Sequence, residues 1–539
     1  MADKSQHIAS ATTTIVEMPD EDASSTKSDK LDAPSPPPPP YSIYTPLQKW
    51  AIVSLVMVAG IFSPITANSY MPAIPAVAES LGVTIQKINL SVTVFMILQA
   101  VTPTIWGSLC DSVGRRPVYL ACLLIYIGSS LGLAFTETYA GLMVLRCVQA
   151  AGSASVVALG SGTIGDLAPP KERGGYMGIY SLGAMLGPCI GPLAGGLLAD
   201  RWDWHAIFFF LTAFSGIVFV LMVVCLPETL RSVVGNGSIQ PTSFINRSVL
   251  SIFLSRRKSS SSDLAAAEAS LAPPKRRSFN PFASLVMFRE KDVALILAWN
   301  SVLYSLFYAI ITSTSSSLKD KYNLSESALG LCYLSVGGGM IAASACNGPR
   351  LNRDYRLVAR RHEEKKAAER AEAGEKEKVV PQDHNDLTGF PIESARLRSL
   401  PYAIVLMLVV TIIYGWTVEK QVHLAVPLIC QFGAGFASMI QFTSISTLLV
   451  DLFPGASASA TAANNLARCL LGAGATAVID PIIAKMGVGW AFTMLSLICV
   501  IFLPTLVLEW FYGQKFRQDR ADRQAKAKRE KEARQKDVV

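Results

Sequence analysis

The chain has 539 residues, of which 51% are hydrophobic and only 16% are charged, and its mean hydropathy is +0.37. Soluble proteins carry about a quarter charged residues, so this composition excludes an ordinary soluble enzyme or binding domain. The formal net charge of +8 resides mostly in basic residues outside the apolar segments. It indicates contact with an anionic membrane surface, and we expect no nucleic-acid partner.

Twelve apolar segments of about 20 residues, the length of a membrane-spanning helix, follow one another along the chain. Their length and continuity predict helices rather than the alternating strands of a membrane barrel. We therefore predict an all-α membrane protein with twelve transmembrane helices. The segments lie near 48–68, 88–107, 117–135, 141–165, 175–198, 206–226, 293–315, 327–347, 400–417, 422–449, 461–483 and 489–511.

The pattern divides the chain into a polar tail, two halves of six spans, a linker between them and a basic tail. The first tail ends in five consecutive prolines and is predicted to be disordered. The second half carries a charged insert near 350–399. The predicted parts are the tail 1–46, the N-terminal half 47–226, the cytoplasmic linker 227–290, the C-terminal half 291–512 and the basic tail 513–539.

Lysine and arginine are concentrated in alternate loops and in the C-terminal tail. By the positive-inside rule these loops and both termini lie in the cytoplasm. We expect a multi-pass protein of the plasma membrane that works as a monomer. The ten cysteines show no paired metal-ligand spacing, so we expect neither a metal site nor a cofactor.

The two halves contain an internal repeat. Asp166-Leu-Ala-Pro closes the fourth span and Asp451-Leu-Phe-Pro closes the tenth, while Gly107 in the gap after span two matches Gly348 in the gap after span eight. A single charged insertion between spans eight and nine reconciles the two offsets. The sequence therefore predicts two parallel six-helix halves, with a substrate site near the midplane between them.

The segment from Gly107 to Arg116 combines small and charged residues in a short gap between spans. Gly107 allows close helix approach, Gly114 permits a tight turn, and Asp111 can accept hydrogen bonds from a helix N-terminus in the other half. Arg115, next to Arg116, can bridge to Asp166 at the end of span four. We interpret these residues as a gating latch.

The second copy of this segment is degraded, because Asn352 replaces the acid and Tyr355 replaces the turn glycine. We expect the second copy to latch weakly, which makes gating asymmetric.

In span four, Arg146, Gln149 and Ser153 share one helix face. An arginine within a spanning helix must face a polar cavity or a partner.

Span five carries small residues at four-residue spacing, together with two prolines that bend the helix. These residues are Gly183, Gly187, Pro188, Gly191 and Pro192.

These segments resemble signatures of the major facilitator superfamily. The stretch 107–116 resembles its loop 2–3 signature, and 142–154 resembles a span-four motif tied to proton coupling. The stretch 183–196 resembles the antiporter motif of its exporters. Two departures stand out, since the expected glycine after Gln149 comes three residues later, at Gly152, and Pro192 replaces a glycine.

Three later stretches, Phe390–Leu397, Thr447–Pro454 and Ala462–Thr476, resemble the fungal twelve-span drug:proton antiporter family. Within it they fit the branch of quinidine-resistance-type, dityrosine and citrate exporters. This resemblance implies a proton-coupled exporter in which Arg146, Gln149 and Ser153 serve proton coupling or substrate contact.

Further polar residues within the spans are candidates for lining a central cavity, although each alone is more often a helix–helix hydrogen bond. They are Asn68, Tyr70, Asn300, Tyr304, Gln431, Gln441, Asn464, Asn465 and Arg468.

Together these features predict a transporter, not an enzyme, whose partners are a small-molecule substrate, protons and the lipid bilayer. The favoured function is efflux of drugs, toxins or secondary metabolites by alternating access. An organic-acid exporter, for citrate or a similar molecule, is the alternative, with Arg146 and Arg468 as counter-ions. A transporter-like sensor without flux is less favoured.

Overall fold

The computed structural model describes residues 41–241, 243–248, 280, 282–322, 324, 326–373 and 389–537. Most of the tail predicted to be disordered, the linker from 249 to 279 and the insert from 374 to 388 lie outside these residues.

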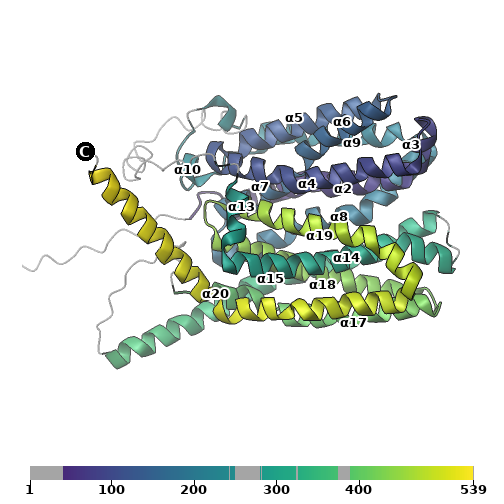
Figure 1. The fold of residues 1–539 in the computed structure, drawn as a ribbon. Coiled ribbons are helices and arrows are strands. Elements are labelled where there is room, and N and C mark those ends of the chain that lie inside the picture. The colour runs from purple at the N-terminus through teal and green to yellow at the C-terminus, as the bar shows by residue number, and fades with distance from the viewer. Residues whose placement is uncertain are drawn as a thin grey trace, which may run out of the picture. The chain divides into compact units, whose positions relative to one another are not determined.

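The first half of the described chain is a bundle of helices (Figure 1). Its first span is a succession of short helices broken near Pro64 and Pro72, because proline interrupts regular helical hydrogen bonding. The elements are α1 (Pro46–Gly60), α2 (Phe62–Ser69), η1 (Met71–Ala73), α3 (Ile74–Ser80), α4 (Ile85–Val113), α5 (Arg115–Ala134), α6 (Tyr139–Ser153), α7 (Ser155–Leu167), α8 (Pro170–Arg201) and α9 (His205–Cys225).

Four short elements and then the long helices of the second half follow. The short elements are α10 (Arg231–Val234), η2 (Phe244–Asn246), α13 (Ala283–Val286) and η3 (Met287–Arg289). The second half consists of α14 (Lys291–Tyr322), α15 (Glu326–Ala373), α16 (Ile392–Leu397), α17 (Leu400–Glu419), α18 (Ala425–Leu452), α19 (Ser457–Met486) and α20 (Val488–Asp537).

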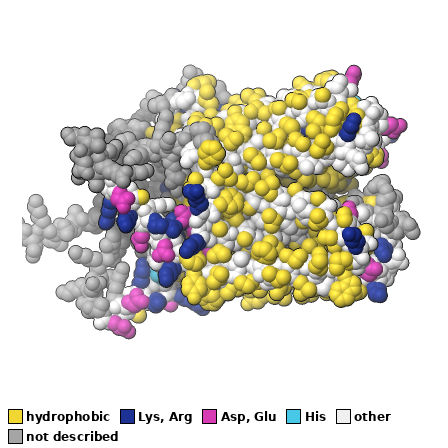
Figure 2. Space-filling model, in the orientation of Figure 1, with side chains coloured by type: hydrophobic (Ala, Val, Ile, Leu, Met, Phe, Trp, Pro, Cys, Tyr) yellow, Lys and Arg dark blue, Asp and Glu magenta, His cyan; other side chains and the backbone are white. Residues whose placement is uncertain are grey.

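Among the described residues, 12 helical segments are long and apolar enough to cross a membrane, which confirms the predicted number of spans. Hydrophobic side chains cover the middle of the bundle, and charged side chains gather at its two ends (Figure 2). The end that holds Arg115, Arg173, Arg396 and Arg520 is called the arginine-rich end below. It is the end predicted to face the cytoplasm.

Each half has its own apolar core. One large cluster of buried side chains belongs almost wholly to α1–α9, and the other almost wholly to α14–α20. The halves meet chiefly where α4 lies against α19 and where α8 lies against α15. The parts of each half that face away from this contact present apolar side chains to the surface, as expected for helices in lipid.

The internal repeat is preserved in sequence but not in local structure. Helix α4 ends at Val113, and Gly114 turns the chain with φ 136°. The corresponding segment 348–356 was predicted to form a gap, but it lies inside the continuous helix α15. Tyr355 stands at the turn position, where a residue with a Cβ is strained at positive φ, so the helix continues. The next described residue after α15 is Gly389, which precedes α16 and has φ 77°.

Candidate functional site

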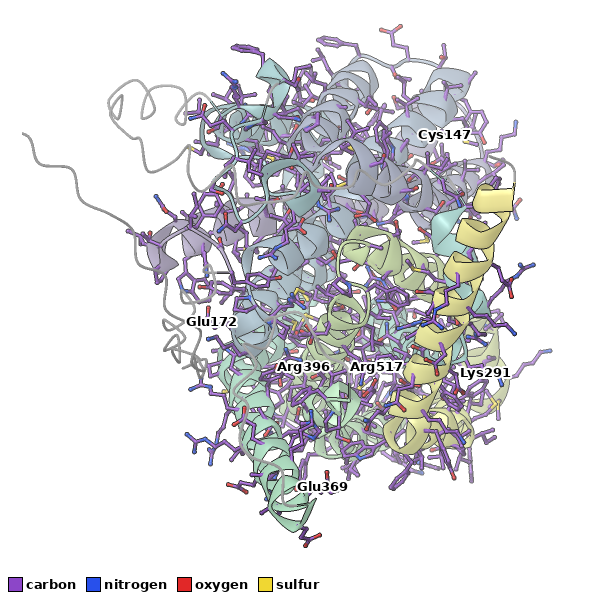
Figure 3. All side chains as sticks on the ribbon, turned by 90° about the vertical axis from the view of Figure 1, so that its left-hand side faces the viewer. Cys147, Glu172, Lys291, Glu369, Arg396 and Arg517 are labelled. Carbon is purple, nitrogen blue, oxygen red and sulfur yellow. The ribbon has the colours of Figure 1, made fainter. Side chains whose placement is uncertain are left out.

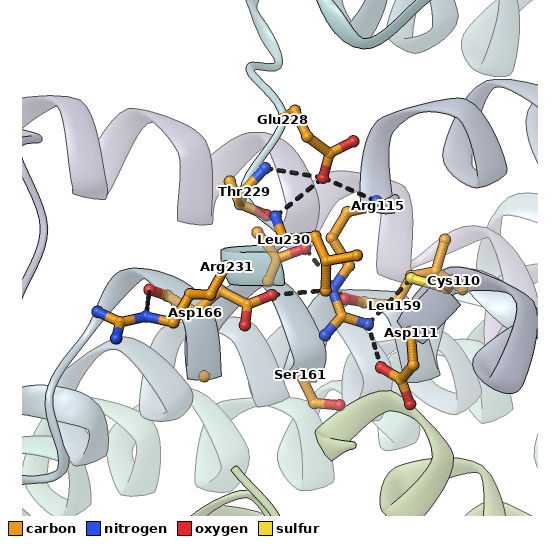
Figure 4. A network of polar contacts seen from close by, with 12 residues as sticks. Cys110, Asp111, Arg115, Leu159, Ser161, Asp166, Glu228, Thr229, Leu230 and Arg231 are labelled. Carbon is orange, nitrogen blue, oxygen red and sulfur yellow. Dashed lines mark hydrogen bonds and ion pairs between the residues drawn. The ribbon is translucent and has the colours of Figure 1, made fainter. Parts of the chain in front are cut away.

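Arg115 is the centre of a buried polar network at the arginine-rich end (Figure 4). Its Nε donates to Oδ2 of Asp166 over 2.9 Å, and its Nη1 donates to Oδ1 of Asp111 over 2.6 Å. The three side chains are 1–6% exposed. An arginine shared between two carboxylates offsets the cost of burying all three charges. The structure thus ties the ends of α4, α5 and α7 together.

Glu228, which sequence reasoning missed, holds the start of α5. Its carboxylate accepts from the backbone N–H groups of Arg115, Arg116, Thr229 and Leu230 at 2.8–3.2 Å. A carboxylate at a helix N-terminus is favourable because it pairs with otherwise unsatisfied N–H groups. A Cβ at Gly114 would lie 2.6 Å from Oε2 of Glu228, which is a second reason why only glycine fits there.

Asp111 also connects the two halves. Its Oδ2 accepts from the backbone N–H of Ser459 at 3.2 Å and from the Ser459 hydroxyl at 2.7 Å. Ser459 lies in the first turn of α19, so the carboxylate meets the positive end of that helix. Beside it, a Cβ on Gly107 would lie 3.1 Å from the carbonyl oxygen of Ala458. The first copy of the repeated segment therefore lies at the contact between α4 and α19.

Arg116 follows Arg115 in the chain, but its side chain makes contacts outside the Arg115 network. Its guanidinium donates to the carbonyls of Val223 and Leu226 at the end of α9, and to that of Ile245. Unpaired carbonyls at a helix C-terminus attract cations. In this conformation Arg116 fixes the end of α9 within the first half.

The second copy also reaches across the halves. Oδ1 of Asn352 accepts from the backbone N–H of Gly175, near the start of α8, at 3.3 Å. This is a longer contact than either bond that Asp111 makes to Ser459, and it involves a neutral acceptor.

Asp451 adds a charged contact at the same place. Its Oδ1 pairs with Arg173 of the first half, and its Oδ2 accepts from Nε of Arg396 at 2.7 Å. Figure 3, which views the molecule from this end, labels Arg396. Arg396 also donates to the carbonyl of Pro170 in the first half. Sequence reasoning paired Asp451 with Asp166 but missed both arginines.

A signal for Arg396 was present in the sequence. Arg396 lies 281 residues after Arg115, and Asp451 lies 285 residues after Asp166, so the second arginine–aspartate pair repeats the first. The insert displaced this arginine from the segment that carries Asn352 and concealed the correspondence.

Arg146 lies within the first half, fully buried. Its Nη1 donates to Oε1 of Gln149 at 2.9 Å, and its Cζ lies 4.4 Å from the ring centre of Tyr70 and 4.3 Å from that of Phe95. Its Nε and second terminal nitrogen have no hydrogen-bond partner among the described residues. Two aromatic faces thus stabilise the cation without a carboxylate.

The other members of this group also remain inside the first half. Gln149 donates to Oγ of Ser130 at 3.0 Å, and the buried hydroxyl of Ser153 finds no partner among the described residues. The structure brings Arg146 and Gln149 together, but Arg146 does not line either of the cavities described below. Tyr70 likewise covers Arg146 rather than a cavity.

The glycines of span five face span one. A Cβ at Gly183 would overlap the carbonyl of Met57, one at Gly187 would overlap Pro64, and one at Gly191 would lie 2.8 Å from Asn68 Cβ. The row therefore lets α8 approach α1 and α2 closely. Pro188 and Pro192 lie within the continuous helix α8.

Two cavities lie near the midplane, and they share Tyr304. The first, of about 30 Å³, lies between the halves and is lined by Asn68, Gln99, Met96, Tyr308 and small residues of α19. The second, of about 20 Å³, is lined by Asn300, Gln441, Phe307, Phe442 and Met407 among others. Four predicted cavity residues, Asn68, Asn300, Tyr304 and Gln441, therefore line these spaces.

Asn464, Asn465 and Arg468 lie next to these cavities on α19. Asn300 donates to Oδ1 of Asn464 at 2.7 Å, and Asn465 donates to the carbonyl of Gln99 in the other half at 2.9 Å. The guanidinium of Arg468 donates to Oδ1 of Asn465 and lies 4.7 Å from the ring centre of Tyr304.

Gln431 lies elsewhere. It joins α18 to α14 and α15 through Thr314 and Ser335.

A bundle of twelve spans in two halves, with polar contacts between the halves at one end and cavities at the midplane, is the architecture of a membrane transporter. The family model described as Major Facilitator Superfamily matches residues 56–361. The chain belongs to the major facilitator superfamily. It is a multi-pass membrane transporter and not an enzyme.

Curated relatives cover nearly the whole chain. The MFS-type transporter phiD of Fungal sp. (strain ATCC 74256) is 37% identical over 92% of this chain and 73% of its own length. Citrate exporter 1 of Aspergillus niger is 36% identical over 92% of both chains. The multidrug transporter QDR2 of Candida glabrata is 34% identical over 85% of this chain and 79% of its own length. The predicted fungal exporter branch is confirmed.

Solved structures share the fold at low sequence identity. The human organic anion transporter MFSD10 (TETRAN) matches with a TM-score of 0.56 and 16% identity, over 86% of this chain and 100% of that one. The proton:xylose symporter XylE matches with a TM-score of 0.59 and 13% identity, over 87% and 96% of the two chains.

Proposed function

We propose that this transporter exports a small organic molecule across the plasma membrane in exchange for protons, by alternating access. Both termini and the arginine-rich end would face the cytoplasm, and the transporter would work as a monomer. The observation that carries the proposal is the contact of the Asp111 carboxylate with the first turn of α19. It closes the arginine-rich end with bonds that must break before the substrate can enter from that side.

Further contacts support the same closed state. Arg173 pairs with Asp451, and Asn352 accepts from Gly175, both between the halves at the arginine-rich end. Alternating access requires these contacts to open when the halves rock. The neutral contact at Asn352 would break more easily during that motion than the charged contact at Asp111.

Proton coupling would run through the buried polar groups of the first half. Arg146 is a buried cation that forms no ion pair with a described carboxylate. Gln149 and Ser153 are buried beside it. Asp111 and Asp166 are the acids of the latch, and both share Arg115. Protonation of either acid would weaken its pairing with Arg115, so proton binding would favour opening of the arginine-rich end.

The cavity walls favour drugs or secondary metabolites as substrates. Tyr304, Tyr308, Phe307 and Phe442 give the midplane an aromatic surface, and amides such as Asn68 supply a few hydrogen-bonding groups. Apolar walls with a few polar groups suit ligands of mixed chemistry. One relative is named a multidrug transporter, which agrees with this choice.

An organic acid is the second candidate, and Arg468 is the observation that favours it. This buried cation lies beside Tyr304 and has no ion pair among the described residues. It would serve as the counter-ion of a carboxylate, and one relative is named a citrate exporter. A sensor without flux is less favoured, because it has no need of contacts between halves that break in each cycle.

Metabolite profiling of the medium tests the proposal. Strains that lack or overexpress the transporter are compared by untargeted mass spectrometry and by a panel of drug susceptibilities. We expect the overexpressing strain to tolerate several drugs or to release more of an aromatic metabolite. A rise of one organic acid with unchanged drug tolerance would replace the first candidate by the second, and no change in either would remove the export function.

A further inference from the structure

A cavity of about 620 Å³ lies apart from the transport site, between α15 and the start of α17. Three arginines line it, Arg350, Arg353 and Arg398, together with Asp354 and Tyr402. The remaining lining is small and mostly apolar. A concave surface with three guanidinium groups and one carboxylate carries an excess of positive charge.

Two of the three arginines form no ion pair among the described residues. Asp354 lies 4.0 Å from Nε of Arg398, and no ion pair within that distance involves Arg350 or Arg353 among the described residues. The Cζ of Arg350 lies 5.6 Å from the ring centre of Tyr402, so the ring helps to orient the guanidinium beside the cavity. Both arginines are exposed and have donors available for an external anion.

The start of α17 adds to the positive potential. Ser399 is the N-cap residue but makes no side-chain capping hydrogen bond. The N-terminus of this 20-residue helix, next to Arg398, adds the positive end of the helix dipole. Arg398 precedes this N-cap, and Tyr402 lies in the first turn.

The cavity lies at the depth of lipid headgroups. The apolar span of α17 begins at Leu400, and Tyr402 near its start is 71% exposed. On α15, the apolar side chain of Ile341 is 53% exposed, and Arg350 follows nine residues later, about 13 Å along the helix. Tyrosine with arginine at such a boundary is typical of a membrane interface.

We propose that this cavity binds the phosphate-bearing headgroup of an anionic phospholipid in the leaflet at the arginine-rich end. Arg350 and Arg353 donate to the phosphate oxygens, Arg398 and the N-terminus of α17 contribute further positive charge, and the ring of Tyr402 lies against the upper acyl chain. A lipid is favoured over a soluble anion, because the cavity borders exposed apolar side chains of both helices.

Native mass spectrometry and thermal unfolding of the full chain in detergent test this site. Phosphatidylinositol 4-phosphate, phosphatidylserine, phosphatidylcholine and inorganic phosphate are each titrated. The variant R350Q/R353Q is compared with R360Q/R361Q, which removes the same charge from exposed positions farther along α15. The single variant R353Q serves as a milder form of the same change.

We expect the two anionic lipids, but not phosphatidylcholine, to remain bound and to raise the unfolding temperature. R350Q/R353Q should weaken apparent binding of the anionic lipids about 30-fold, at about fivefold for each arginine, and R360Q/R361Q should leave it nearly unchanged. Equal lipid binding by both double variants would overturn the site. Stabilisation by inorganic phosphate equal to that by the lipids would overturn the assignment to a lipid.

Discussion

Arg173 and Asp451 form an ion pair that joins the two halves of the transporter at the arginine-rich end. Arg396 bonds the other oxygen of the same carboxylate, and all three side chains are almost fully buried. The second half therefore contributes a charged contact to the closed state, in addition to the neutral contact of Asn352. The two halves therefore differ in where the charged contact lies. In the first half it lies within the repeated segment, at Asp111, and in the second half it lies outside that segment, at Asp451.

Arg173→Ala should destabilise the closed state. Asp451 would keep Arg396 but lose its partner in the other half, and breaking a buried ion pair by removing one partner costs about 3 kcal/mol. Thermal unfolding in detergent measures this loss. Lys171→Ala, two residues earlier and exposed, is the matched control. Equal unfolding temperatures of the two variants would exclude a stabilising role for the pair.

Asp111→Asn should open the arginine-rich end more often. The amide keeps one acceptor but loses the charge that meets the α19 N-terminus and Arg115, a difference of about 1.4 kcal/mol or a factor of ten. Cys110 is fully buried in the first half, and Nη1 of Arg115 donates to its Sγ at 3.0 Å, so its labelling by a maleimide reports loosening of this network as the end opens. We expect labelling to rise about tenfold and turnover to fall at normal surface expression.

Ser112→Ala is the control for this measurement, since among the described residues the Ser112 hydroxyl bonds only to the carbonyl of Leu109 within α4. Labelling of Cys110 in Asp111→Asn at the rate of this control would show that Asp111 does not hold the end closed.

Gly187→Ala should prevent normal packing of span five on span one. The added Cβ would overlap Pro64, and overpacking of this kind costs about 1–3 kcal/mol. At Gly196 the nearest atom to an added Cβ is 3.9 Å away, so Gly196→Ala should be tolerated. Yield and monodispersity after purification measure both. Normal behaviour of Gly187→Ala would mean that the glycine row is not needed for this contact.

The sequence alone was sufficient to predict the twelve spans, because long apolar runs leave little choice of structure in a membrane. It also predicted that Asp111, Arg115 and Asp166 belong together, since an almost complete motif places them at the ends of neighbouring spans. The structure brings these three side chains into one network.

Other features depended on tertiary context. Helix α15 continues through Tyr355, and the partner arginine of the second half lies after the charged insert, at Arg396. Arg146 was expected to face a polar cavity or a partner, and Gln149 is that partner, but the rings of Tyr70 and Phe95 that cover the guanidinium were not foreseen. Contacts between residues so distant in sequence leave no local pattern from which to predict them.

Glu228 and Glu509 should respond differently to loss of charge. Glu509 lies 281 residues after Glu228, the same interval as between Arg115 and Arg396. The Glu228 carboxylate accepts four backbone N–H groups, whereas both oxygens of the buried Glu509 lack a hydrogen-bond partner among the described residues. Burial also raises the pKa of the neighbouring Glu393, against the effect of Arg517.

Glu228→Gln should therefore lower the unfolding temperature, because a buried carboxylate that caps a helix contributes about 1–3 kcal/mol. Glu509→Gln should leave that temperature unchanged or raise it, because a neutral amide is cheaper to bury than an unpaired carboxylate. The two variants serve as controls for each other. A larger loss of stability in Glu509→Gln would contradict this assignment.

Transport by purified protein in vesicles tests proton-coupled export most directly. The compound identified by metabolite profiling is added to vesicles that contain the wild-type chain or Arg146→Ala, with or without an imposed pH gradient. We predict that the gradient drives the wild type to accumulate the compound against its concentration, that a protonophore abolishes this accumulation, and that Arg146→Ala only equilibrates it. Equal accumulation without a pH gradient, or by Arg146→Ala, would contradict the account.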